Sequence, residues 1–154
     1  MRIPGGIRVK LTLALLGIVG GALLAAFAIV VPSLEQRLVN AKLDQLQSDA
    51  EALAVNYALN RQRLEDFVDA AAFVSNARVV VFDVVDPPGN GILRSLADSS
   101  PVGRFEIVDD PAALEAAKGA GTIRARIVRD GREYAEVATT LLATGDVMLL
   151  SSSL

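Results

Sequence analysis

The sequence predicts an α+β fold preceded by one transmembrane helix. Residues 11–31 form 21 consecutive positions without a charged side chain. Residues 33–77 contain no Gly or Pro and repeat apolar residues at helical spacing, and the remainder alternates β-branched runs with turn residues. Strands in two runs separated by a short helix are typical of a mostly antiparallel sheet with helices on one face.

The composition of the chain excludes several functional classes. The 154-residue chain leaves 123 residues after Val31, enough for one domain with its own core. The net charge is −3 and no basic run follows the N-terminal flank, so we expect no nucleic-acid binding. The chain contains no Cys and no His. We therefore expect no metal site, no cofactor and no catalytic residue in this segment.

The apolar segment at residues 11–31 has the length of a membrane-spanning helix. At 1.5 Å per residue it measures about 32 Å, which covers the hydrocarbon core of a bilayer. Basic side chains lie before it in residues 1–10, and the first charge after it is Glu35. The positive-inside rule then predicts a cytoplasmic N-terminus and an extracytoplasmic domain over residues 32–154, anchored in the cell (inner or plasma) membrane.

A cleaved signal peptide is the alternative interpretation of this segment. Ala26-Phe27-Ala28 fits a small-x-small cleavage site, but the apolar run continues past it to Val31. We therefore expect an uncleaved anchor in the lipid bilayer.

Three small residues lie at helical spacing inside the predicted membrane helix. Gly17, Gly21 and Ala25 form a row that lets two helix backbones approach closely. Gly and Ala are also simply common in membrane helices, so both interpretations stay open.

A long helix is predicted after the membrane segment. Pro32 follows the apolar run, and Ser33 is a suitable N-cap. Apolar residues then recur at alternating spacings of four and three from Val39 to Val74, with Asn60 as the one polar member. Long polar side chains at residues 60–63 predict a break into two helices there.

The apolar stripe of this helix has two interpretations. It can pack onto the protein's own sheet, or it can form the seam of a parallel homodimer. We expect the later half to enter the domain core and the first half to form the dimer seam. The predicted seam residues are Val39, Leu43, Leu46, Ala50 and Leu53.

Two strands and a turn follow the helices. Residues 77–85 are β-branched and aromatic, which predicts a buried strand. The two prolines and two glycines of residues 86–91 require a loop. A second strand is predicted over residues 92–97, and a short third strand over residues 104–108.

The C-terminal third predicts a short helix and three strands. Asp110 can cap a helix that has Pro111 at its first position and ends at Gly119. A hairpin over residues 122–142 turns around Arg129-Asp130-Gly131, and residues 147–152 form the last strand.

The hairpin allows two registers. A two-residue turn pairs Glu136 with Ala125 and Tyr134 with Ile127. A three-residue loop pairs Glu136 with Arg124 and Tyr134 with Arg126, and it separates apolar from charged side chains better. We therefore expect the three-residue loop.

Several phrases resemble the extracytoplasmic sensor segment of bacterial sensor histidine kinases. These phrases are residues 31–35 at the membrane exit, 77–83 in the first strand, 96–99 after the first hairpin, and 110–119 in the short helix. The resemblance covers essentially the whole chain and implies a PAS-like (Cache-type) domain. The loop at residues 87–91 is longer than the usual link in that family.

The resemblance implies a signal-sensing input module of a two-component receptor. In such a receptor a homodimer passes an envelope or small-molecule stimulus through the membrane helix to a kinase core, which acts on a response regulator. No second membrane helix, HAMP linker, phospho-acceptor His or ATP-binding box follows in this sequence, so we expect a truncated receptor. The alternatives are the input module of a chemoreceptor or cyclic-dinucleotide enzyme, and a single-pass envelope protein that binds or scaffolds a partner without signalling.

The candidate ligand-binding residues lie on the hairpin. Arg124, Arg126 and Tyr134 share one face in the expected register and can bind an anion; the alternative is a solvated face that pairs with Glu136. The carboxylates of the chain show no loop of interleaved oxygen ligands. The candidates considered for metal or acid–base chemistry are Asp83, Asp86, Asp98, Asp109 and Asp110. Asp98 is assigned to an Asx-type turn and Asp110 to the helix cap.

Overall fold

A computed structural model describes residues 6–60, 63–85, 92–100 and 107–154 of the chain. It contains two compact units, Met1–Leu38 and Val39–Leu154. The first unit is helical from Ile7 onward and leaves its apolar side chains exposed. In the described part of the chain, one helix near the N-terminus is long and apolar enough to cross a membrane. This agrees with the predicted apolar span.

Helix α1 (Ile7–Asn60) is longer than predicted because no new helix starts at Ser33. Pro32 lies inside α1, and the Ser33 hydroxyl donates a hydrogen bond back to the Val30 carbonyl at 2.9 Å. The predicted N-cap is therefore wrong: a proline removes one backbone donor, and the helix continues past it. The predicted break is confirmed, since α1 ends at Asn60 and α2 (Leu64–Ser75) follows.

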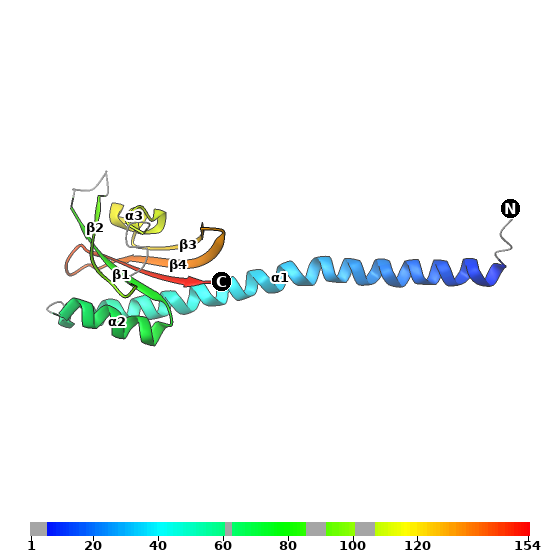
Figure 1. Cartoon of the computed structure of the whole chain (residues 1–154), viewed down its shortest axis with the longest axis horizontal. Coiled ribbons are helices and arrows are strands. Elements are labelled where there is room, and N and C mark those ends of the chain that lie inside the picture. The colour runs from blue at the N-terminus through cyan, green and yellow to red at the C-terminus, as the bar shows by residue number, and fades with distance from the viewer. Residues whose placement is uncertain (1–5, 61–62, 86–91, 101–106) are drawn as a thin grey trace. The chain divides into compact units, whose positions relative to one another are not determined.

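The remaining elements form a five-stranded antiparallel sheet with one short helix, as predicted (Figure 1). The strand order is β2-β1-β5-β4-β3. The strands are β1 (Arg78–Val84), β2 (Leu93–Asp98), β3 (Thr122–Arg129), β4 (Arg132–Thr140) and β5 (Val147–Ser153). Helix α3 (Pro111–Glu115) continues into a π-helical turn, η2 (Ala116–Ala120), in which Gly119 has a φ of +88°. The loop at 87–91 and most of the strand predicted at 104–108 lie outside the described residues.

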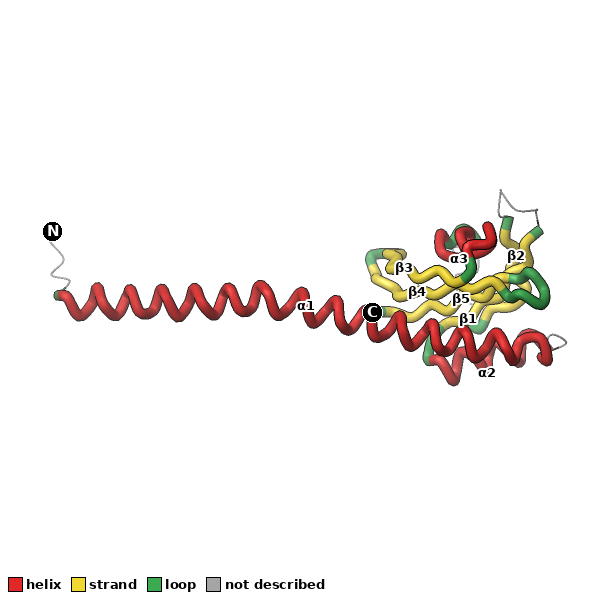
Figure 2. The backbone as a smooth tube through the Cα atoms, turned by 180° about the vertical axis from the view of Figure 1, so that it is seen from behind, coloured by secondary structure: helices red, strands yellow, loops and turns green. Residues whose placement is uncertain are grey.

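The fold class is α+β, and the helices are divided between the two faces of the sheet instead of sharing one (Figure 2). Alternate residues of β1 make this division visible. Val79 and Val81 pack with the α1 segment of the domain and with α2, whereas Val80 and Phe82 pack with α3. Because side chains alternate along a strand, both faces of the central strands are buried.

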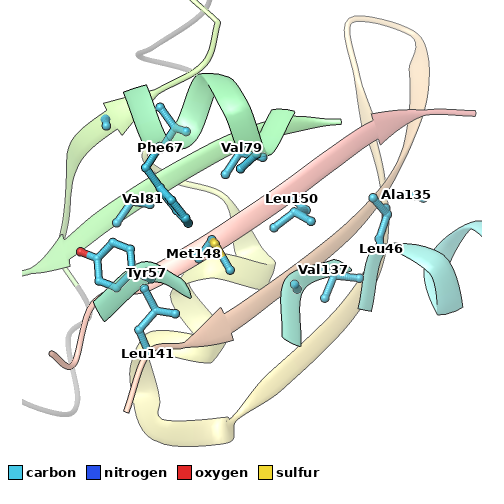
Figure 3. Close-up of a cluster of buried hydrophobic side chains, with 14 of the residues drawn as sticks. Leu46, Tyr57, Phe67, Val79, Val81, Ala135, Val137, Leu141, Met148 and Leu150 are labelled. Carbon is cyan, nitrogen blue, oxygen red and sulfur yellow. The ribbon is translucent and has the colours of Figure 1, made fainter. Parts of the chain in front are cut away.

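We call the sheet face that packs against α1 and α2 the helix face, and the opposite one the α3 face. The core on the helix face contains the apolar stripe that the sequence assigned to a dimer seam. Leu43, Leu46 and Ala50 are buried against the sheet, and Val39 and Leu53 pack at the edge of the same cluster. Figure 3 shows Leu46 with Tyr57, Phe67 and the inward side chains of β1, β4 and β5. The seam assignment is therefore wrong for Leu43, Leu46 and Ala50, because the domain uses them for its own core. For the half-buried Val39 and Leu53 it stays a prediction. Formation of a homodimer stays a prediction.

The β3–β4 hairpin has the register that the sequence analysis ranked second. Ala125 pairs with Glu136 and Ile127 with Tyr134 across a two-residue turn. Asp130 and Gly131 have φ values of +49° and +74°. Positive φ at both positions is the type I′ turn, whose twist matches that of the flanking strands. The predicted three-residue loop is wrong, because turn geometry and a buried charge outweighed the separation of apolar from polar side chains.

Candidate ligand-binding site

A buried carboxyl group marks the candidate site on the α3 face of the sheet. Glu136 of β4 has no exposed surface, although it carries an ionisable side chain. Its Oε1 accepts a hydrogen bond from the Ser151 hydroxyl at 2.6 Å and pairs with Nη1 of Arg129 at 2.6 Å. The two-residue hairpin turn places Glu136 there, because this register turns its side chain toward α3.

Asp110 connects this carboxyl group to the short helix. It is the N-cap of α3, and its Oδ1 accepts a hydrogen bond from the Ala113 amide at 2.9 Å. Its Oδ2 forms an ion pair with Nη2 of Arg129. Asp110 is almost fully buried. The predicted cap is confirmed, and the same carboxylate also attaches α3 to the sheet.

Arg129 lies between the two carboxyl groups at the end of β3. Its guanidinium pairs with Glu136 and Asp110 and lies 5.6 Å from the ring centroid of Tyr134. Only 18% of the Arg129 side chain is exposed. A planar guanidinium suits this position because it can bind two carboxylates through different N–H groups.

The ionisation of Glu136 is unusual. Burial, followed by the neighbouring Asp110 carboxylate, raises the pKa of Glu136 from 4.5 to about 7. The hydrogen bonds from Ser151 and Arg129 act in the opposite direction. For Arg129, burial lowers the pKa but the two carboxylates outweigh it, so the pKa is raised and the guanidinium stays charged.

The geometry explains where a proton would reside. In the described part of the chain, Oε2 of Glu136 has no hydrogen-bond donor. A proton on this oxygen would satisfy it and would remove the repulsion from Asp110. Near neutral pH the group Glu136–Arg129–Asp110 therefore exists in two ionic states, with net charge 0 or −1.

Hollows lie next to this charged group. A small enclosed cavity of about 90 Å³ is lined by Arg78, Ile107, Tyr134 and Ser151 together with Arg129 and Asp130. Arg129 and Asp110 also line an open hollow of about 370 Å³. A small polar ligand entering either space would meet Arg129 directly.

The predicted ligand-binding residues are not brought together. Arg126 faces the helix side of the sheet and pairs with Glu133, while Arg124 pairs with Asp44 of α1 at 2.7 Å. Tyr134 lies on the opposite face, beside Arg129. The grouping of these three residues is wrong because it followed from the three-residue loop.

The sequence did not identify Arg129 and Glu136 as site residues. One signal could have indicated Glu136: it stands between Ala135 and Val137 in a strand whose neighbours are apolar. A charge inside a strand buried on both faces needs a partner. The sequence does not indicate which arginine provides it.

The other carboxylates have structural roles. Asp98 accepts a hydrogen bond from the Ser100 amide at 2.9 Å, the predicted Asx-type turn, and pairs with Arg78 at 2.6 Å. Asp83 pairs with Arg94 at 2.5 Å on the surface. Among the described residues, no group of three or more His, Cys, Asp or Glu side chains could hold a metal ion.

The small-residue row lies in the first unit. Gly17, Gly21 and Ala25 are exposed along α1, and nothing lies within 4 Å of a Cβ added at either glycine. Packing of this row against another membrane helix stays a prediction.

Comparison with known proteins identifies no relative. No family model matches the chain, and neither a curated protein nor a solved structure is significantly similar to it.

Proposed function

We propose that the chain is the sensory input module of a membrane-anchored receptor, with an extracytoplasmic domain that passes a stimulus to a histidine kinase core. The apolar N-terminal helix, the α+β domain after it and the resemblance of four sequence phrases support this proposal. It also includes a cytoplasmic N-terminus, as the basic flank predicts.

The observation that carries the proposal is the buried group Glu136–Arg129–Asp110. Two buried carboxyl groups and an arginine lie between the sheet and a short helix. A sensor needs an element with two states of similar free energy. This group has two ionic states near neutral pH, and a proton or a polar ligand at Arg129 would favour one of them.

The domain also offers a route from this group to α1. Glu136 pairs with Ser151 across β4 and β5, and the next residue along each strand, Val137 and Leu150, packs into the core on the helix face. Leu46 of α1 belongs to that core. A displacement of α3 against the sheet would therefore change the packing of α1, the helix that contains the apolar segment.

The coding sequence downstream of codon 154 tests this proposal. We expect a second apolar segment, followed by a helical hairpin that carries the phospho-acceptor His. A natural stop codon directly after codon 154 would contradict the proposal and favour an envelope protein without signalling output. A different downstream domain would assign the module to a chemoreceptor or a cyclic-dinucleotide enzyme instead.

A further inference from the structure

A second polar hollow lies at the end of the sheet where β1 begins and β5 ends. Its volume is about 580 Å³, within the range of small-molecule sites. Residues of α1, the α2–β1 junction, β4 and β5 line it. The lining side chains relevant to binding are Lys42, Arg78, Arg132, Tyr134, Ser152 and Ser153.

The lining of this hollow is strongly cationic. It includes three basic side chains and no acidic one, in a chain whose net charge is −3. Arg78 is held by a two-pronged pair with Asp98, at 3.0 and 2.6 Å. Within the described residues, Lys42 and Arg132 have no ion-pair partner. Two positive charges there are therefore uncompensated.

Hydroxyl donors accompany these charges. Ser151 donates to Glu136, but the side chains of Ser152 and Ser153 have no hydrogen-bond partner in the described part of the chain. Arginine, lysine and hydroxyl groups together are the donors that bind the oxygens of a phosphate.

We propose that this hollow binds a phosphate-type oxyanion through Lys42, Arg132 and the hydroxyl groups at the end of β5. The oxyanion can be a dissolved phosphate or the phosphate of an anionic lipid headgroup, since the chain also contains a helix able to enter a bilayer. The inference does not depend on the proposed signalling function, because it concerns binding by the isolated chain.

The test uses the full chain in nanodiscs and records NMR shifts of the Ser152 and Ser153 amides. The first arm adds inorganic phosphate to phosphatidylcholine nanodiscs, with NaCl of equal ionic strength as the reference. The second arm replaces part of the lipid by phosphatidylglycerol without added phosphate. We expect saturable shifts in at least one arm, and the responding arm identifies the source of the oxyanion.

Charge-removing variants complete the test. The double variant Lys42→Gln/Arg132→Gln should weaken binding by about tenfold or more. The control Arg126→Gln removes an exposed arginine on the other side of β3 and should bind like the unchanged chain. Absence of shifts in both arms, equal shifts with NaCl, or unchanged binding by the double variant would overturn the proposal.

Discussion

The two faces of the sheet differ in how they are held to their helices. The helix face is joined to α1 and α2 by an apolar core that contains Leu46, Tyr57 and Phe67. The α3 face also has an apolar core, but it attaches the start of α3 through Asp110, Arg129 and Glu136. Apolar packing contains no group that titrates, whereas a buried charged group responds to pH. The helix face therefore contributes stability that does not depend on pH, and the response to pH resides on the α3 face.

Removal of the shared cation should have the largest effect. The variant Arg129→Met leaves Asp110 and Glu136 buried without a positive partner. We therefore expect the free energy of unfolding to fall by about 4 kcal/mol at pH 8. The loss should be smaller at pH 5, where Glu136 is protonated. Pulse proteolysis in urea on the chain in detergent micelles measures both values.

The control for this variant is Arg94→Met, which breaks the exposed pair with Asp83. It should change stability little at either pH. An equal loss in both variants would show that the α3 face does not depend on the buried group.

A cavity on the helix face should lower the free energy of unfolding by about 3 kcal/mol at every pH. Leu46 is fully buried, and Leu46→Ala removes its packing without touching a charge. The matched control is Leu142→Ala, at a residue with 99% of its surface exposed. Proteolysis at pH 5 and pH 8 checks the prediction. A clear pH dependence of the Leu46→Ala loss would mean that the two faces do not differ as described.

Stability of the unchanged chain should fall as pH rises. The pKa of Glu136 is raised from 4.5 to about 7, so between these values the folded state binds more protons than the unfolded state. This contribution is fully present below about pH 4.5 and is lost as pH rises through 7, at most about 3 kcal/mol. Urea midpoints from pH 5 to pH 8 measure it. The variant Glu136→Gln should abolish this part of the slope; an unchanged slope would assign it to other groups.

The exposed ion pair on the helix face should contribute least. Arg124 pairs with Asp44, but both side chains are substantially exposed. We expect Arg124→Gln to change stability by less than about 0.5 kcal/mol and any effect to diminish in high salt. Unfolding with and without added NaCl checks this. A loss comparable with that of Arg129→Met would remove the distinction between the faces.

Much of the fold could be predicted from the sequence because its signals are local. The cap at Asp110 and Pro111, the helix break near Asn60 and the β-branched run in β1 each depend on neighbouring residues. The division of the helices between two faces could not be predicted, since it depends on which face each loop reaches. The continuation of α1 through Pro32 was missed because proline was interpreted as a boundary.

The candidate site was harder to predict than the fold. The choice between two hairpin registers decided which arginines faced α3, and a shift of one residue exchanges the faces of every side chain. The separation of apolar from charged side chains favoured the register that places Glu136 on a solvated face. In the structure Glu136 is buried, Arg129 of the neighbouring strand compensates its charge, and Asp110, from a more distant segment, pairs with the same guanidinium.

The most direct test is a measurement of the pKa of Glu136. Carboxyl ¹³C shifts of the Glu-labelled chain, recorded across pH and assigned by comparison with Glu136→Gln, give this value residue by residue. The account predicts a pKa of about 7, and a return toward the ordinary value in a variant such as Asp110→Asn that removes the neighbouring charge. A pKa near 4.5 in the unchanged chain would contradict the account, because the α3 face would then have one ionic state near neutral pH.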